Sequence, residues 1–526
     1  MHHTATSLRG MVASPHHLAS QAGLDIIRQG GTAAEACIAT ASTLSVVYPH
    51  MNSIGGDSFW LVSEPDRRVH AIDACGAAAA KADLALYRGL DSIPTRGPLA
   101  ANTVAGTISG WQALLDTSGS GLSPQILLND AITYAESGVP VTIGGSELAF
   151  AKSEELRGLP GAYTTIFEPN GAPLQPQEIL RQPALGQTLR ALARDGFESF
   201  YNGKLGSLIA EDLAQLGSPV SSEDLRSHKV SRPQPLSSQL SKATVYNLPP
   251  PTQGLASQLI LALFDRIAPS NGGGFDHIHR LVEATKQAFL IRDVHIGDPL
   301  YMRLNPQELL DNSSALDEMA KRIDLQKAAP WPRISAPGDT VWFGAADSRG
   351  QVVSCIQSTY FEFGSGLVLP RTGIIWQNRG SSFLLANDGA NALKPGRKPF
   401  HTLNPAMAHF PDGRVMAYGT MGGEGQPQTQ AAIFSRYAWY DMPLQQTIAA
   451  PRWLLGRTWG DTSTSLKLEQ NFPDRLSEQL RRAGHDVEIV SSLNSIMGHA
   501  GAVVAHSSGI LEGAHDPRSD GTAAAF

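Results

Sequence analysis

Two strand-like runs joined by a short turn constrain the fold of this chain more than any other feature. Segments 341–346 and 351–358 are rich in β-branched and aromatic residues, and 347–350 between them has turn composition. A Pro-Gly pair precedes Asp339 and Thr340, so the first strand of the predicted β-hairpin begins at a hydroxyl residue. Because Thr is a good strand former in its own right, the hairpin alone predicts no catalytic role for Thr340.

The composition narrows the class of protein. The chain has 526 residues, 42% of them hydrophobic and 17% charged, which is enough apolar material for a large core. Its formal charge is −7 and no basic block is present, which argues against nucleic acid or an anionic membrane as a partner. Neither a secretory signal nor a bilayer-spanning apolar stretch is evident, so we expect a cytoplasmic protein.

Helical patterns occur on both sides of the hairpin. An apolar stripe predicts an amphipathic helix up to about residue 29, and 32–48 is apolar nearly all round, which predicts a buried helix. Further helices are expected at 276–293, 427–439 and 474–484. The polar segment 309–330 predicts two short charged helices, which we expect to form an exposed tail.

The sequence contains no spacing typical of a metal site. His277 and His279 lie two residues apart on a predicted helix and would point to different faces, so we expect structural or exposed side chains. The cysteines are far apart and lie among apolar or small residues, which indicates buried reduced thiols; they are Cys37, Cys75 and Cys355.

Several stretches of the chain match one known family. The chain resembles the γ-glutamyltranspeptidase family of N-terminal-nucleophile hydrolases over nearly its whole length. The resemblance includes segments 339–347 and 363–373 and the pair Gly422-Gly423. This resemblance implies an α/β fold, a four-layer αββα sandwich. It also implies a proenzyme that cuts itself between Asp339 and Thr340. The products would be a large chain, 1–339, and a small catalytic chain, 340–526, which together form one αββα domain and a heterodimer.

The family's chemistry explains why the Thr has to become terminal. A Thr hydroxyl is a weak nucleophile that needs an adjacent base, and a free α-amine, with a pKa of about 7.7–8.0, can be that base. By the resemblance, Thr340 is the nucleophile, its own α-amine is the base, and the N–H groups of Gly422 and Gly423 form the oxyanion hole. Such chemistry needs no metal or organic cofactor.

The residues that bind a γ-glutamyl group in the family are replaced here. Cys75 stands where the family has the Arg that binds the α-carboxylate, and Ser382 stands where it has the Asp that binds the amine. Tyr360 and His401 are larger than the residues they replace, so we expect a smaller substrate. Arg379 is a new candidate partner for a substrate anion, the alternative being a surface or interchain ion pair. The predicted substrate-binding residues are Ser358, Tyr360, Arg379, Ser382, His401 and Thr402.

One branch of the family is more similar to this chain than the others. Segments 73–80, 94–101 and 418–428 resemble the branch that hydrolyses oxamate in bacterial purine degradation. The function that this implies is a self-processing amidohydrolase that converts oxamate to oxalate and ammonia. Two alternatives remain open: a γ-glutamyl hydrolase or transferase for glutathione-type substrates, and an unprocessed pseudoenzyme that acts as a binding protein.

Overall fold

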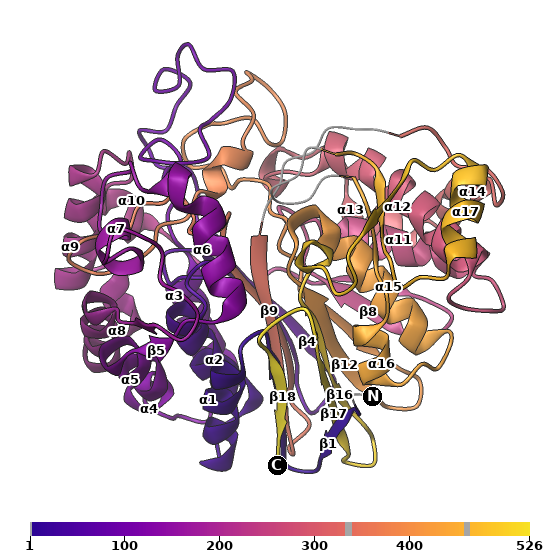
Figure 1. Ribbon diagram of the computed structural model, residues 1–526, viewed down its shortest axis with the longest axis horizontal. Coiled ribbons are helices and arrows are strands. Elements are labelled where there is room, and N and C mark those ends of the chain that lie inside the picture. The colour runs from indigo at the N-terminus through magenta and orange to yellow at the C-terminus, as the bar shows by residue number, and fades with distance from the viewer. Residues whose placement is uncertain (1–2, 332–338, 457–462) are drawn as a thin grey trace.

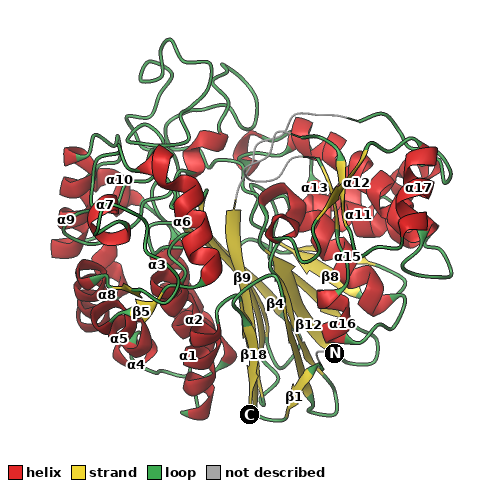
Figure 2. Cartoon of the chain, in the orientation of Figure 1, coloured by secondary structure: helices red, strands yellow, loops and turns green. Residues whose placement is uncertain are grey.

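The chain folds into four layers, with two antiparallel sheets packed face to face between two layers of helices (Figure 1). The computed structural model describes residues 3–331, 339–456 and 463–526. The predicted Pro-Gly turn before Asp339 lies outside these residues. The strands occupy the centre of the molecule and the helices its two flanks (Figure 2), which confirms the predicted αββα sandwich.

The predicted hairpin lies in the middle of one sheet. Its strands are β9 (Asp339–Asp347) and β10 (Val352–Tyr360), which pair with Val341 opposite Gln357. Within the described residues this sheet has six strands, in the order β18-β2-β9-β10-β3-β4. The other four are β2 (Gly10–Ser14), β3 (Asp57–Ser63), β4 (Val69–Ala74) and β18 (Thr522–Ala525).

The second sheet covers the inner face of the first. Across the described residues it has seven strands, in the order β1-β17-β16-β12-β11-β8-β7. They are β1 (Ala5–Ser7), β7 (Leu236–Gln239), β8 (Thr244–Asn247), β11 (Ala406–His409), β12 (Val415–Thr420), β16 (Ala500–Ala505) and β17 (Leu511–His515). Smaller sheets are formed by β13 (Trp453–Leu455), β14 (Leu466–Glu469) and β15 (Val487–Val490), and by β5 (Val139–Pro140) and β6 (Ile179–Leu180).

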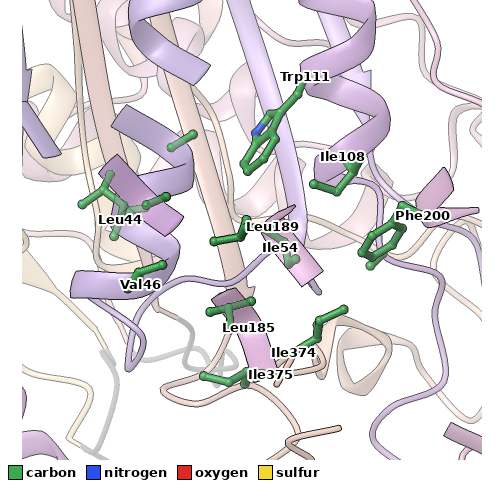
Figure 3. Close-up of a cluster of buried hydrophobic side chains, with 14 of the residues drawn as sticks. Leu44, Val46, Ile54, Ile108, Trp111, Leu185, Leu189, Phe200, Ile374 and Ile375 are labelled. Atoms are coloured by element: carbon green, nitrogen blue, oxygen red, sulfur yellow. The ribbon is translucent and has the colours of Figure 1, made fainter. Parts of the chain in front are cut away.

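Apolar helices cover the outer face of the six-stranded sheet. The helix α2 (Ala33–Val47) is buried along its entire length against β9 and β10, as its composition predicted. Beside it lie α1 (His17–Arg28), α3 (Thr107–Ser118) and α5 (Asn129–Ser137), and α8 (Pro183–Asp195) packs on α5. Figure 3 shows how side chains of α2, α3 and α8, such as Leu44, Trp111 and Leu189, meet in this core.

A second set of helices covers the seven-stranded sheet. These are α11 (Gly254–Ile267), α12 (Phe275–His295) and α15 (Gln426–Ala438). The expectation of an exposed tail at 309–330 is wrong, because α13 (Pro306–Asp311) and α14 (Ser313–Lys321) pack on α11 and bury Leu310, Leu316 and Met319. Two apolar faces only a few residues long were enough to anchor these otherwise polar helices.

The remaining helices are short or peripheral. They are α4 (Pro124–Leu127), α6 (Ile143–Leu156), α7 (Tyr163–Phe167), α9 (Gly203–Gln215), α10 (Ser222–Ser227), α16 (Leu444–Ala449) and α17 (Asp474–Ala483), with 3₁₀ turns η1 (Phe197–Phe200), η2 (Pro299–Tyr301), η3 (Arg379–Ser382), η4 (Gly423–Gly425) and η5 (Ser495–Met497). None of the helices in the described residues is long and apolar enough to cross a lipid bilayer.

The two sheets bring several strand ends to one edge of the sandwich. On the six-stranded sheet β9 begins, β10 ends and β3 begins at this edge. On the facing sheet β12 ends there and leads into Gly422. Trp342 lies between the sheets, and Gly419 and Gly501 leave the space that its indole fills. The predicted nucleophile and the predicted oxyanion loop therefore lie next to each other.

Candidate active site

Thr340 is buried at the start of β9, and its hydroxyl is held by a glutamine that the sequence did not single out. The Oγ1 atom of Thr340 accepts a hydrogen bond from Nε2 of Gln426 at 3.2 Å. Gln426 is the first residue of α15, and its Oε1 accepts the N–H of Asn404 at 3.3 Å. Its amide is therefore oriented from both sides, and it fixes the position of the hydroxyl. Its place directly after the Gly-rich 422–425 turn was the only signal in the sequence.

The Gly422-Gly423 turn adopts a conformation that only glycine enters readily. The φ angles are +114° and +51°, both in the left-handed region. Neither N–H donates to another described residue. The carbonyl of Gly423 accepts from Nε2 of Gln253 at 2.8 Å, and a buried ion pair between Arg292 and Glu424, at 2.8 Å, braces the same turn. The turn is thus rigid, and its two N–H groups can bind an oxyanion.

Arg379 is buried and is linked to this turn through Thr402, because the carbonyls of Thr402 and Gly423 both accept from Gln253. It is 1% exposed, and no carboxylate of the described residues lies within ion-pair distance. The guanidinium lies 3.7 Å above the ring of Tyr360, and one of its N–H groups donates to Oγ1 of Thr402 at 3.3 Å. Burial lowers the pKa of Arg379 to about 10, so it remains a cation at neutral pH. The alternative of a surface or interchain ion pair is therefore wrong.

His401 lies next to Arg379 and is completely buried. Its Nε2 is 3.5 Å from Oδ2 of Asp57, and its ring meets the edge of Phe59. Burial, and then the positive charges of Arg379 and Lys398, hold the pKa of His401 well below its ordinary value. The imidazole is therefore neutral, and it can take part in the site as a hydrogen-bonding group but not as a cation.

Asp57, the first residue of β3, is a member of this cluster that sequence reasoning missed. Its Oδ1 accepts the N–H groups of Gly76 and Gly106, both at 3.0 Å. Burial raises the pKa of Asp57 to about 7, against the effect of these two hydrogen bonds and of Arg379. An acidic residue opening a fully buried strand after Gly55-Gly56 was the available signal.

The other predicted site residues hold the backbone around the cluster. The Oγ of Ser358 accepts the N–H of Tyr360 at 2.8 Å, which supports the left-handed φ of +83° at that residue. Ser382 donates to the carbonyl of Phe400 at 3.0 Å. The carbonyl of Thr402 accepts from Gln253 at 2.7 Å. Whether Ser358, Ser382 or Thr402 also contacts a substrate stays a prediction.

A cavity of about 310 Å³ opens beside the cluster, and both Cys75 and Lys398 contribute to its wall. Cys75 is buried, and its expected place at the position of a carboxylate-binding Arg stays a prediction. The ammonium of Lys398 is already paired with Asp73 at 2.6 Å. Arg379 has no carboxylate within ion-pair distance among the described residues, and one of its terminal nitrogens has no hydrogen-bond partner there.

One group of side chains has the composition of a metal site. Nitrogen or oxygen atoms of His279, Glu283 and His485 lie within 4.8 Å of one another, and all three residues are buried. However, Glu283 is paired with Lys286 at 2.7 Å and the two imidazoles hydrogen-bond to each other at 2.8 Å. These atoms already satisfy one another, and the positive charge of Lys286 opposes a metal cation.

His277 and His279 are both buried. Of the two expectations for these side chains, structural or exposed, the structural one applies.

Comparison with known proteins shows which family and which structures this chain resembles. Residues 19–526 match the family model described as Gamma-glutamyltranspeptidase. The chain is 52% identical to the oxamate amidohydrolase proenzyme of Klebsiella pneumoniae over 530 residues, which cover 100% of both chains. It is 38% identical to the glutathione hydrolase-like YwrD proenzyme of Bacillus subtilis, over 99% of both chains. The crystal structure of cephalosporin acylase from Bacillus halodurans superposes with a TM-score of 0.92 at 31% identity, covering 100% of this chain and 97% of that one.

Proposed function

The chain belongs to the gamma-glutamyltranspeptidase family, and we propose that it is a self-processing amidohydrolase that hydrolyses oxamate to oxalate and ammonia. One observation carries this proposal. A buried Arg379 has no carboxylate within ion-pair distance among the described residues. Its guanidinium lies over Tyr360, which pairs with Asp339 next to the nucleophile, and it donates to Thr402, whose carbonyl shares the donor Gln253 with Gly423 of the oxyanion turn. A single cation next to the scissile bond suits a substrate whose carboxylate is joined directly to its amide. The oxamate amidohydrolase proenzyme, 52% identical, supports the same substrate.

The first step is maturation of the chain. The Oγ1 of Thr340 attacks the carbonyl carbon of Asp339, the peptide C–N bond breaks, and an ester forms while the α-amine of Thr340 is released. Water then cleaves the ester and leaves the chains 1–339 and 340–526. The relatives named above are also proenzymes.

The strand order supports a stable heterodimer after this cut. In the six-stranded sheet, β2 of the large chain lies between β18 and β9 of the small chain. In the seven-stranded sheet, β8 of the large chain pairs with β11 of the small chain. Because both sheets and both interfaces between helices and sheets are shared, neither chain can leave without breaking backbone ladders.

Hydrolysis follows the same chemistry with an external amide. The α-amine of Thr340 takes the hydroxyl proton while Oγ1 attacks the amide carbon of the substrate. The N–H groups of Gly422 and Gly423 bind the oxyanion, and Arg379 pairs with the carboxylate. The proton passes to the leaving nitrogen and ammonia departs. Water then attacks the acyl ester, and oxalate leaves as the hydroxyl of Thr340 is restored.

The site does not suit a γ-glutamyl group, which is a zwitterion with charges at the far end. Cys75 and Ser382 cannot pair with those charges, and each unpaired buried charge would cost several kcal/mol. Tyr360, the last residue of β10, is buried with its ring under the guanidinium of Arg379, and it is larger than the residue that the family has there. The glutathione hydrolase-like relative keeps γ-glutamyl hydrolysis as the second candidate.

An ammonia-release assay separates these functions. The purified protein is offered oxamate, oxalurate-like amides, glutamine and a γ-glutamyl anilide, and we expect oxamate to have the highest kcat/KM. Preference for the γ-glutamyl compounds would refute the oxamate proposal. A denaturing gel with one band near 56.0 kDa and no smaller pair would show that self-cleavage does not occur. A cytoplasmic location and a place in purine degradation stay predictions.

A further inference from the structure

Four buried polar atoms gather beside the proposed substrate and have no hydrogen-bond partner among the described residues. They are Oδ2 of Asp57, both ring nitrogens of His401 and one terminal nitrogen of Arg379. The three side chains are 0–1% exposed. Buried polar atoms in folded proteins are nearly always paired, because an unpaired one loses its hydration without compensation. Oδ2 of Asp57 and Nε2 of His401 lie 3.5 Å apart and can pair with each other once one proton is shared between them. This leaves Nδ1 of His401 and the terminal nitrogen of Arg379 for a ligand to complete.

The net charge around Asp57 depends on whether Asp57 itself is ionised. Arg379 on η3 is a cation, and His401 is neutral. Cys75 after β4 and Tyr201 after η1 both face Asp57, and burial raises the pKa of each, so both are uncharged. Gln377 also faces it and carries no charge. An ionised Asp57 therefore cancels the charge of Arg379, whereas a protonated Asp57 leaves one positive charge for one carboxylate.

The environment of His401 adds one further cation. Lys398 faces the imidazole, but its ammonium is paired with Asp73 at 2.6 Å. Asp73 therefore balances Lys398, and Asp57 balances Arg379. A substrate carboxylate that entered beside an ionised Asp57 would put two negative charges against one guanidinium, which is unfavourable in a dry site.

We propose that Asp57, His401 and Arg379 form a single subsite for a carboxylate, and that Asp57 takes up one proton from solvent when the anion binds. This inference rests on the proposed function, since the anion is the carboxylate of the small amide substrate. The proton bonds to Oδ2 of Asp57, which can then donate to Nε2 of His401, 3.5 Å away. The imidazole proton then lies on Nδ1. The substrate charge is thereby matched by Arg379 alone.

The direction of the pH effect follows from the ionisation of Asp57. Its pKa is already raised to about 7 in the free protein, and a second carboxylate nearby raises it further. Binding therefore weakens as pH rises above about 7, by up to about tenfold per pH unit for one proton. The α-amine of Thr340 has the opposite requirement, because it must lose its proton to act as a base. The kcat/KM profile for oxamate should thus be bell-shaped.

Replacing Asp57 by asparagine tests this assignment. The Asn oxygen can still accept from Gly76 and Gly106, and its NH₂ group mimics the donor of the protonated acid. We expect kcat/KM of Asp57→Asn to rise through the same acid limb and then to stay level, without the alkaline decline. The control is Asp212→Asn, because Asp212 is a buried aspartate of α9 that pairs with Arg371. This variant should keep the bell-shaped profile. An alkaline limb that persists unchanged in Asp57→Asn would overturn the proposal.

Proton uptake can also be measured on the unaltered protein, so the test does not depend on the folding of a variant. Oxalate, the proposed product, is titrated by calorimetry at about pH 8 in buffers of different ionisation enthalpy. We expect Asp57 to take up about 0.9 proton per bound anion, since about a tenth of Asp57 is protonated beforehand. The α-amine of Thr340 can add to this uptake at about pH 8, so the part that is lost in Asp57→Asn is the part assigned to Asp57. Oxalate binding without proton uptake, together with oxamate hydrolysis, would overturn this inference alone. Neither hydrolysis of oxamate nor binding of oxalate would instead refute the proposed function.

Discussion

Removing the guanidinium of Arg379 should abolish recognition of the substrate carboxylate while leaving self-cleavage intact. Arg379 is 1% exposed, and it contacts the ring of Tyr360 and the hydroxyl of Thr402, while the carboxyl of Asp57 faces it beyond ion-pair distance. A carboxylate that enters this site therefore loses its water and has one cationic partner. Processing involves no external anion, so Arg379→Ala should still yield both chains.

The expected loss in kcat/KM for oxamate can be bounded. Removing one member of a buried, hydrogen-bonded charge pair costs about 2–5 kcal/mol. At about 1.4 kcal/mol per factor of ten, this corresponds to a loss of about 30- to 4,000-fold in kcat/KM for oxamate. We expect the upper half of this range, because Lys398, the other cation that faces His401, is already paired with Asp73. His401→Ala should have a smaller effect, since a neutral imidazole contributes a hydrogen bond only.

The same substitution should not destabilise the free protein when the shape is preserved. Burial lowers the pKa of Arg379 to about 10, which corresponds to a penalty on its charge on the order of 3 kcal/mol. Arg379→Met keeps an unbranched chain against Tyr360 and removes this penalty. We expect its Tm to equal or exceed that of the unaltered protein, although oxamate hydrolysis is lost.

Steady-state kinetics measure the loss in kcat/KM, denaturing gels show whether self-cleavage occurs, and thermal melts give the Tm of each variant. The control is Arg371→Ala. Arg371 pairs with Glu211 and Asp212, two residues of α9, and its removal should not affect the KM for oxamate. If Arg379→Ala processes fully and keeps the KM of the unaltered protein, the anion site lies elsewhere. Lys398, which lines the neighbouring cavity, would then be the next candidate.

Three further predictions concern the remaining parts of the site. Thr340→Ala should stay a full-length chain on denaturing gels, whereas Thr340→Ser should process slowly and keep some activity; two fragments in Thr340→Ala would exclude Thr340 as the processing residue. Gln426→Ala should lower kcat by about 2- to 10-fold, the value of one neutral hydrogen bond to Oγ1. Its control Gln428→Ala, which breaks hydrogen bonds to Leu455 instead, should lower Tm and leave kcat unchanged. Cys75→Arg and Ser382→Asp combined should improve binding of γ-glutamyl compounds more than the sum of the single changes, because the two charges hold opposite ends of one zwitterion; additive effects in inhibition assays would contradict this.

Local patterns in the sequence were sufficient to predict the parts of the fold that depend on neighbouring residues. The hairpin of β9 and β10 follows from alternating β-branched residues around a turn, and the burial of α2 follows from its continuous apolar surface. For the hairpin and for α2 the determining interactions lie within a few residues along the chain. The roles of Thr340 and of the Gly422-Gly423 turn came instead from the resemblance to a known family, and they stay predictions.

The charged and polar parts of the site were decided by the tertiary structure alone. Asp57, Arg379 and His401 come from three distant segments, and their ionisation depends on how deeply each is buried and which charge lies beside it. The same arginine on a surface would be an ordinary ion-pair partner. Gln426 likewise gains its role only because α15 begins next to β9. Sequence patterns carry information on periodicity, but the electrostatic environment of a side chain is set by residues that folding brings to it.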